Sequence, residues 1–190
     1  MPRSLIDSFR LVILANELEN NPNAAYRFSD PDGVLTGKSG WSYGISQLDI
    51  NNNPSAILGL RDCAFTTDQI AALKAQTVRD MAPMNAKLKA AAEIIDAWDK
   101  KQLQECLTQP SAICSDSGIR FSDAGLISMA DYHNQMYMSR GGKLHKHLAA
   151  LKQVVTAEII RDFKLSLPWG QKRPDDVKRR YNNIVKVMRG

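Results

Sequence analysis

Residues 17–26 read ELENNPNAAY, and residues 39–49 read SGWSYGISQLD. The first stretch comes at the end of a segment, residues 4–19, whose apolar side chains recur at helical spacing. The second stretch is rich in glycine, serine and aromatic residues, which is typical of a hairpin. The sequence therefore predicts a helix that ends in two carboxylates, Glu17 and Glu19, followed by a small antiparallel sheet.

The remainder of the chain shows mostly helical patterns. Asn53 before Pro54, and Thr66 three residues before Gln69, are helix-start signals. Further helices are predicted near 83–98, 100–108, 122–139, 143–164 and 174–188, with breaks at 109–110, 141–142 and 168–170.

We expect one domain, because 190 residues suffice for one core and are few for two. Within it we place helix 4–19, a small β-subdomain at 20–53 and a helical lobe at 54–190. The predicted fold class is α+β, mostly helical, with a cleft between the sheet and the helical lobe.

The charge is unevenly distributed along the chain. The whole sequence carries 25 Lys and Arg against 20 Asp and Glu, a net charge of +5. Residues 141–190 hold twelve of these cations against four acids, so this segment alone carries +8. Such a segment favours a polyanionic partner, which could be a nucleic acid, an anionic lipid surface or an anionic wall polymer, because charge does not choose among these. The partners we expect are anionic envelope polymers or a membrane surface, and no specific nucleic acid. We expect the protein to be a monomer.

Other chemistries find little support in the sequence. Gly37-Lys38-Ser39 resembles the end of a phosphate-binding loop, but Asp32 occupies the position of the required first glycine. The acidic stretches at 30–33 and 49–53 lack the closing glutamate of a calcium loop, and the three histidines do not share a helix face. Cys106 and Cys114 are near enough in sequence to pair, which leaves a disulfide open. We expect no metal and no cofactor.

A carboxylate at a helix end, followed by a hairpin with hydroxyl, amide and carboxylate groups, suits glycosidic cleavage. That reaction needs a partly buried carboxylic acid to protonate the leaving oxygen. The two stretches resemble the lysozyme superfamily, in particular goose-type lysozymes and lytic transglycosylases of the bacterial wall. In that family a catalytic glutamate begins a Glu-Ser-x-x-Asn-Pro-x-Ala run, and a Gly-Leu-Met-Gln motif follows on the hairpin.

Here Glu17 stands five residues before Pro22, and residues 44–47 read Gly-Ile-Ser-Gln. Leu18 replaces the usual serine, Ser46 replaces the methionine, and the segment between the two motifs is longer than in goose-type enzymes. Phage-type lysozymes place the glutamate seven residues before a tyrosine, and that register selects Glu19 instead.

The resemblance implies a peptidoglycan glycosidase that attacks the bond between N-acetylmuramic acid and N-acetylglucosamine. Glu17 is then the general acid, with Glu19 as the alternative, while Asp49 and Ser42 position water or stabilise the developing cation. The remaining implied contacts with the sugar are Trp41, Tyr43, Gln47, Tyr132 and Asn134.

We find no secretory signal, so the resemblance implies a phage endolysin that is made in the cytoplasm and reaches the wall after holin-type release or secretion. The alternatives are a chitosanase or chitinase of the same superfamily, or a basic binding domain without enzymatic activity.

Overall fold

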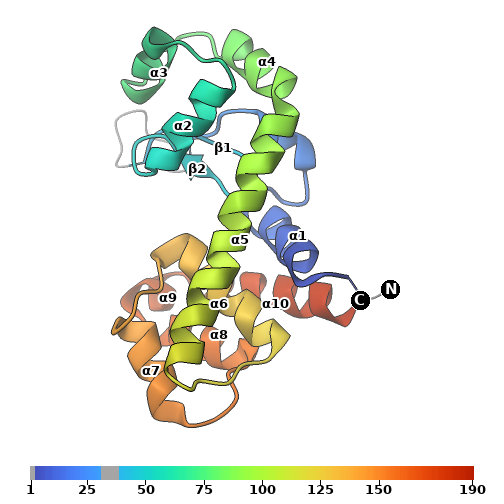
Figure 1. The fold of residues 1–190 in the computed structure, drawn as a ribbon, viewed down its shortest axis with the longest axis vertical. Helices are drawn as coiled ribbons and strands as arrows, with labels where there is room; N and C mark the ends of the chain where they lie inside the picture. The colour runs from blue at the N-terminus through green and yellow to red at the C-terminus, as the bar shows by residue number, and fades with distance from the viewer. Residues whose placement is uncertain (1–2, 31–38) are drawn as a thin grey trace. The chain divides into compact units, whose positions relative to one another are not determined.

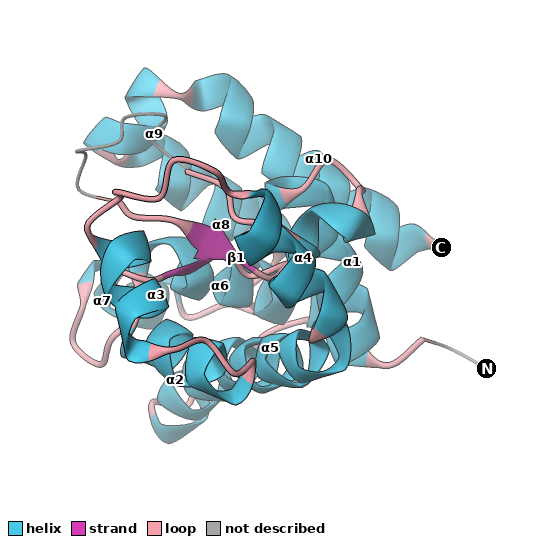
Figure 2. Cartoon of the chain, turned by 90° about the horizontal axis from the view of Figure 1, so that it is seen from above, coloured by secondary structure: helices cyan, strands magenta, loops and turns pink. Residues whose placement is uncertain are grey.

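The computed structural model describes residues 3–30 and 39–190 of the chain. Within this part the fold is mostly helical, with one small antiparallel sheet, as the sequence predicted (Figure 1 and Figure 2). The contacts group the chain into two compact units. Unit 1 comprises residues 1–16 and 103–190, and unit 2 comprises residues 17–102. These divisions, after residues 16 and 102, differ from the predicted one at residue 53. Asp32, Gly37 and Lys38, which the sequence analysis weighed as part of a phosphate-binding loop, lie outside the described residues.

Unit 2 begins at the last residue of helix α1 (Leu5–Glu17). A short 3-10 helix η1 (Pro22–Tyr26) leads to strands β1 (Ser42–Tyr43) and β2 (Leu48–Asp49). The strands pair antiparallel, with Ser42 opposite Asp49 and Tyr43 opposite Leu48. Helices α2 (Pro54–Asp62), α3 (Thr67–Lys74) and α4 (Ala82–Ala90) follow.

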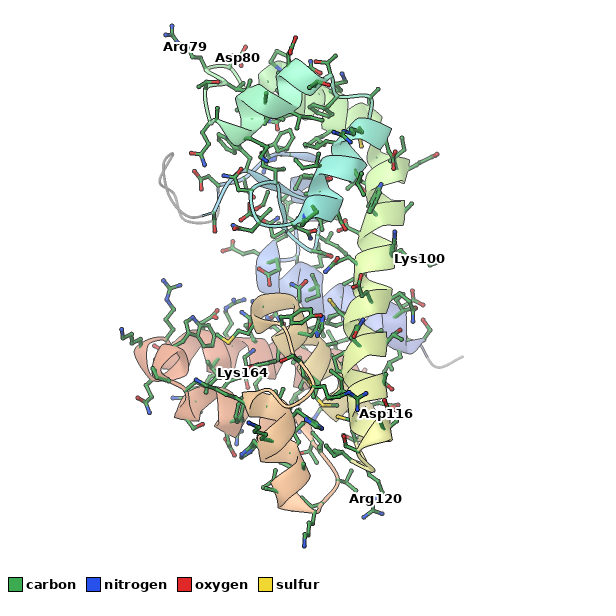
Figure 3. All side chains as sticks on the ribbon, turned by 60° about the vertical axis from the view of Figure 1, so that its left-hand side comes forward. Arg79, Asp80, Lys100, Asp116, Arg120 and Lys164 are labelled. Atoms are coloured by element: carbon green, nitrogen blue, oxygen red, sulfur yellow. The ribbon has the colours of Figure 1, made fainter. Side chains whose placement is uncertain are left out.

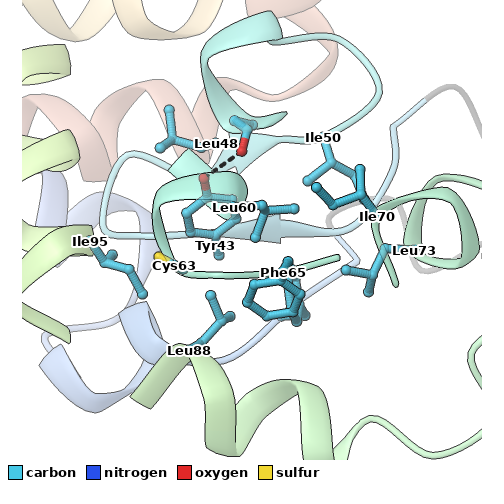
Figure 4. Close-up of a cluster of buried hydrophobic side chains, with 12 residues drawn as sticks. Tyr43, Leu48, Ile50, Leu60, Cys63, Phe65, Ile70, Leu73, Leu88 and Ile95 are labelled. Carbon is cyan, nitrogen blue, oxygen red and sulfur yellow. Dashed lines mark hydrogen bonds between the residues drawn. The ribbon is translucent and has the colours of Figure 1, made fainter. Parts of the chain in front are cut away.

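The core of unit 2 is apolar and includes aromatic side chains from the hairpin and from the loops around it (Figure 4). Phe28 packs edge-on against both Tyr43 and Phe65, with 5.9 Å between ring centroids in each pair. The Tyr43 hydroxyl donates a 2.7 Å hydrogen bond to the carbonyl of Ala56, the dashed line in Figure 4. The hairpin is thereby fixed to the start of α2.

The predicted helix starts in this unit are confirmed. The Asn53 side chain accepts from Ser55 N with Pro54 in the first turn, and Thr66 and Gln69 form a capping box. Both signals act over three residues, so the sequence alone specifies them.

Unit 1 contains most of α1, the second half of α5 (Ala92–Asp116) and the C-terminal helices. These helices are α6 (Asp123–Met136), α7 (Lys143–Leu151), α8 (Ala157–Ser166), α9 (Pro168–Lys172) and α10 (Pro174–Arg189).

Several predicted boundaries are wrong. The helices predicted at 83–98 and 100–108 are instead divided at Ala91, between α4 and α5, and residues 168–170, where we expected a break, lie in α9. Helix α5 continues through Pro110, where we expected a break. Its second half buries Leu103, Leu107 and Cys114 on one side, and this burial outweighs the lost backbone hydrogen bond.

The segment predicted as one helix over 143–164 is instead divided between α7 and α8. The backbone N–H of Val155 donates to Arg120 O and its carbonyl accepts from Ser122 N, so a pairing with a distant segment overrides the helical pattern.

Candidate functional site

The two sequence motifs are joined in the structure. The N–H of Gly44, in the hairpin turn, donates a 2.8 Å hydrogen bond to the carbonyl of Ala25, in η1. The backbones of Ser29 and Ser42 exchange hydrogen bonds in an isolated bridge. The Asn-Pro-x-Ala run and the Gly-Ile-Ser-Gln turn, about twenty residues apart in sequence, therefore form one hydrogen-bonded element of unit 2.

The end of α1 holds its two glutamates in different environments. Glu17 is the last helical residue and is partly buried, whereas Glu19 is exposed. Glu19 and Asn20 both adopt positive φ, 50° and 64°, and turn the chain sharply after the helix. Asn21 then caps η1 by accepting from Asn23 N. Of the two glutamates, Glu17 is therefore the less exposed.

Asp49 holds the loop that follows β2. Its Oδ1 accepts from the backbone N–H groups of Gly40 at 3.1 Å, Asn51 at 2.8 Å and Asn52 at 3.3 Å. Its Oδ2 accepts from the Asn52 side chain at 2.8 Å. A carboxylate offers about four acceptor sites. Asp49 is therefore engaged in fixing the loop.

Gln47 braces the hairpin turn. Its Oε1 accepts from the Ser29 hydroxyl at 2.7 Å, and its Nε2 donates to the Gly44 carbonyl at 3.1 Å. Its φ of 52° shows that the turn places it in the left-handed region. The predicted contact of Gln47 with sugar stays a prediction, while its contacts in the structure are with the hairpin itself.

Asp99, on α5, supports the hairpin turn, and the sequence did not predict this role. It is 1% exposed, and its carboxylate accepts from Ile45 N at 2.8 Å and Ser46 N at 3.2 Å. Burial raises its pKa to about 6, although the two backbone hydrogen bonds act in the opposite direction. A Cβ on Gly44, whose φ is 76°, would lie 2.7 Å from Asp99 Oδ1, so the turn requires glycine here.

Three hairpin residues that we expected near substrate belong to the core or its edge. Ser42 and Tyr43 are both 0% exposed. The Tyr43 hydroxyl is bonded to Ala56, and burial raises its pKa. Trp41 is partly buried against the core of unit 2. This corrects the expected substrate roles of Ser42 and Tyr43, because neither side chain offers surface to a sugar or to water.

The two residues expected to bind sugar from the helical lobe lie in unit 1, on α6. Tyr132 is 7% exposed and packs edge-on against Phe163, and its expected contact with sugar stays a prediction. Asn134 is partly buried, with its Oδ1 3.9 Å from Cys106 Sγ. Cys106 and Cys114 are not joined by a disulfide bond.

The strongest polar cluster of unit 1 surrounds Asp131, next to Tyr132. Arg180 donates to both carboxylate oxygens, at 3.2 and 2.6 Å, and Lys164, labelled in Figure 3, donates at 3.0 Å. Asn16 also donates at 3.0 Å. Burial alone would raise the pKa of Asp131, but the two cations and their hydrogen bonds hold it well below its ordinary value. All three charged residues are at most 4% exposed.

This cluster corrects part of our view of the basic C-terminal segment. Arg180 is committed to Asp131, and Arg179 donates to the carbonyls of Ala15 and Asn16 and to Asp176. The +8 charge is thus partly structural. Lys172, Lys178 and Lys186 are exposed or partly exposed and stay available to an anionic partner.

A serine–histidine pair also lies in unit 1, but its hydrogen bonds do not suit nucleophilic catalysis. Ser117 Oγ is 2.8 Å from His145 Nε2, and Gly141 N donates to His145 Nδ1 at 2.9 Å. In the neutral ring Nδ1 is then the acceptor and Nε2 carries the proton. His145 therefore donates to Ser117 and cannot take its proton.

Among the residues that the structure describes, no group of three or more His, Cys, Asp and Glu side chains could hold a metal ion. Within the same residues, no helix combines the length and apolar character needed to span a membrane.

No protein-family model matches the chain, and comparisons with curated proteins and with solved structures found no match. A function for the chain must therefore be inferred from its own residues.

Proposed function

We propose that this protein is a peptidoglycan glycosidase of lysozyme-like architecture, cleaving the β-1,4 bond between N-acetylmuramic acid and N-acetylglucosamine. One observation carries the proposal: the Gly44 N–H to Ala25 carbonyl hydrogen bond joins the Asn-Pro-x-Ala run to the Gly-Ile-Ser-Gln turn. The run follows directly from the helix end that bears Glu17. A candidate acid and a rigid polar hairpin thus share one compact unit.

Glu17 is the general acid in this proposal. A glycosidase acid protonates the leaving oxygen of the scissile bond from a partly buried position beside the substrate. Glu17 is partly buried at the end of a helix, while Glu19 is exposed in the following turn. The contrast in exposure supports the goose-type register over the phage-type one.

The hydrogen bonds that the Asp49 carboxylate already accepts favour transglycosylation over hydrolysis. Hydrolysis needs a group that positions the attacking water, and the Asp49 carboxylate already accepts from Gly40, Asn51 and Asn52. With that carboxylate engaged, attack by the 6-hydroxyl of the substrate's own muramic acid is the favoured route. The product would then be a 1,6-anhydro end, which is lighter than a reducing end by one water.

The test compares Glu17→Gln with its matched neighbour Glu19→Gln on purified peptidoglycan. We expect Glu17→Gln to lower turnover by at least about a hundredfold, the usual scale for losing a general acid. Glu19→Gln should keep most of the activity, and circular dichroism should show both variants folded. The reverse ranking would establish the phage-type register. If the wild type binds peptidoglycan without cleaving it, and both variants bind equally well, the protein is a binding domain.

Mass spectrometry of the wild-type products tests the route of attack separately. We expect 1,6-anhydromuramic ends. Reducing muramic ends would show that water attacks, and that a group other than the loop-bound Asp49 carboxylate positions it.

The exposed lysines of unit 1 supply the proposed attraction to an anionic envelope, which the protein reaches after release from the cytoplasm. Replacing Lys172, Lys178 and Lys186 with glutamine should lower activity on intact wall several-fold at low salt, because long-range attraction raises encounter rates. Activity on a short soluble oligosaccharide should not change. Wild-type lysis should fall as salt rises, since the Debye length shrinks to about 8 Å at physiological ionic strength. Parallel salt curves for the two proteins would refute this role.

A further inference from the structure

Unit 2 contains a pocket of about 340 Å³ that none of the proposed catalytic groups lines. It is lined by Asn21, Asn23, Tyr26, Arg27, Asn85, Ala86 and Lys89, which come from η1, its flanking residues and α4. This volume is within the range of pockets that hold small ligands. The pocket begins two residues after Glu19 in the sequence, so it belongs to the same turn as the candidate acids.

The two walls of the pocket are held together by a specific contact. The Asn85 side chain, on α4, accepts a 2.9 Å hydrogen bond from Phe28 N, just beyond η1. On the η1 side, Tyr26 donates from its hydroxyl to Asp96 at 3.0 Å. These two hydrogen bonds anchor the elements that form the pocket.

The chemistry of the lining selects an anionic, hydrogen-bonding ligand. Arg27 and Lys89 supply two positive charges, and no acidic side chain lines the pocket. Neither cation makes an ion pair or a side-chain hydrogen bond with any residue that the structure describes. Asn21, Asn23 and Asn85 add amide groups, which pair well with peptide amides and carboxylates.

We infer that this pocket binds the carboxylate-bearing peptide stem of peptidoglycan. The inference rests on the proposed function and extends that function by naming a second part of the substrate. The stem is attached to the same muramic acid whose glycosidic bond is cleaved, so a stem site belongs beside the acid. The stem carries amides and free carboxylates in alternation, which matches the asparagines and the two cations of the lining.

The binding test uses a probe without sugar, so that it reports the pocket alone. N-acetyl-L-alanyl-D-glutamate carries two carboxylates, and its diamide is the neutral counterpart. We expect NMR titration of the wild type to show at least roughly tenfold tighter binding of the charged probe at low salt, the scale of two exposed charge contacts. The amides of residues near Asn21 and Asn85 should shift.

Two double variants test the assignment. Arg27→Gln/Lys89→Gln should weaken binding of the charged probe roughly tenfold and bring it close to that of the diamide. Lys74→Gln/Arg79→Gln removes the same charges from positions of unit 2 that do not line the pocket, and it should bind as the wild type does (Figure 3 shows Arg79). Equal binding of the two probes, or no effect of the first variant, would overturn the inference. If inorganic phosphate binds the pocket and the dipeptide does not, the inference is also overturned.

Kinetics separate this inference from the proposed function. The ratio of KM for amidase-stripped glycan to KM for stem-bearing glycan should be above one in the wild type and should fall toward one in Arg27→Gln/Lys89→Gln. A ratio that does not change would overturn the stem site while leaving the glycosidase intact. Absence of cleavage with either glycan would overturn the glycosidase, and the probe titration would still decide whether the pocket binds the dipeptide.

Discussion

Asp131 in unit 1 and Asp99 in unit 2 are each 1% exposed, but their surroundings act on them in opposite ways. Asp131 meets two buried cations, Lys164 and Arg180, and its pKa is held low. Asp99 instead accepts from the backbone N–H groups of Ile45 and Ser46, and burial raises its pKa to about 6. Burial alone therefore does not decide the charge of a carboxylate. The groups that contact the carboxylate, cationic side chains at Asp131 and backbone N–H groups at Asp99, also decide it.

The difference also assigns different tasks to the two acids. Asp131 joins α6 to α8 and α10 and thereby organises the helices of unit 1. Asp99, on α5, holds the turn that carries Gly44 and Gln47. The first is a structural ion cluster, whereas the second supports the hairpin of the candidate site.

The largest expected effect comes from removing the charge of Asp131. Asp131→Asn leaves Lys164 and Arg180 buried without a counter-charge, and breaking a buried pair in this way costs about 3–5 kcal/mol. Chemical denaturation should show this loss. Asp116→Asn, which breaks an exposed pair with Arg140, should cost less than about 1 kcal/mol.

A triple variant separates lost charge balance from lost packing. Replacing Asp131 with leucine, and Lys164 and Arg180 with methionine, removes every charge of the cluster while keeping apolar volume. We expect it to recover most of the stability that Asp131→Asn loses. If the triple variant is as unstable as Asp131→Asn, the charge imbalance is not the cause.

The next effect is a pH dependence that belongs to Asp99. Because its pKa is about 6 in the folded protein, against an ordinary value of 3.8, the folded protein retains a proton between these values. The resulting stability is fully present below about pH 4 and is lost as pH rises through about 6, by on the order of 2–3 kcal/mol. Denaturation curves across pH 4–7 should show the fall.

Asp99→Asn should flatten that curve, since asparagine does not titrate. Asp68→Asn, an exposed acid on α3, should keep the wild-type slope. Asp131 acts in the opposite sense: its lowered pKa gives stability that is lost only in stronger acid, below about pH 4. If Asp99→Asn shows the wild-type fall, another group causes it.

The sequence predicted the features that depend on neighbouring residues. The helix class, the small antiparallel sheet within 20–53 and the caps at Asn53 and Thr66 are confirmed. The continuation through Pro110 and the interruption around Val155 were not predictable, because burial and a distant backbone pairing decide them.

The same distinction applies to the candidate site. The helix-end glutamates and the hairpin are visible in sequence, but Asp99 lies more than fifty residues after the turn it supports. Which face of the hairpin is buried was also not predictable, since strands of two residues carry too little alternation. For that reason Ser42 and Tyr43 were expected at the substrate and are in the core.

The smallest effect compares one substitution, serine to alanine, in the two units. Ser42 is buried in unit 2, and its hydroxyl has no hydrogen-bond partner among the described residues. Ser128 is buried in unit 1, and its hydroxyl donates to Ala124 O at 2.8 Å. An unpaired buried hydroxyl is destabilising, so Ser42→Ala should be neutral or stabilise by up to about 1 kcal/mol, while Ser128→Ala should cost about 1 kcal/mol. Denaturation of both variants at one pH measures the difference, and a clear loss in Ser42→Ala would show that its hydroxyl makes a hydrogen bond that stabilises the hairpin.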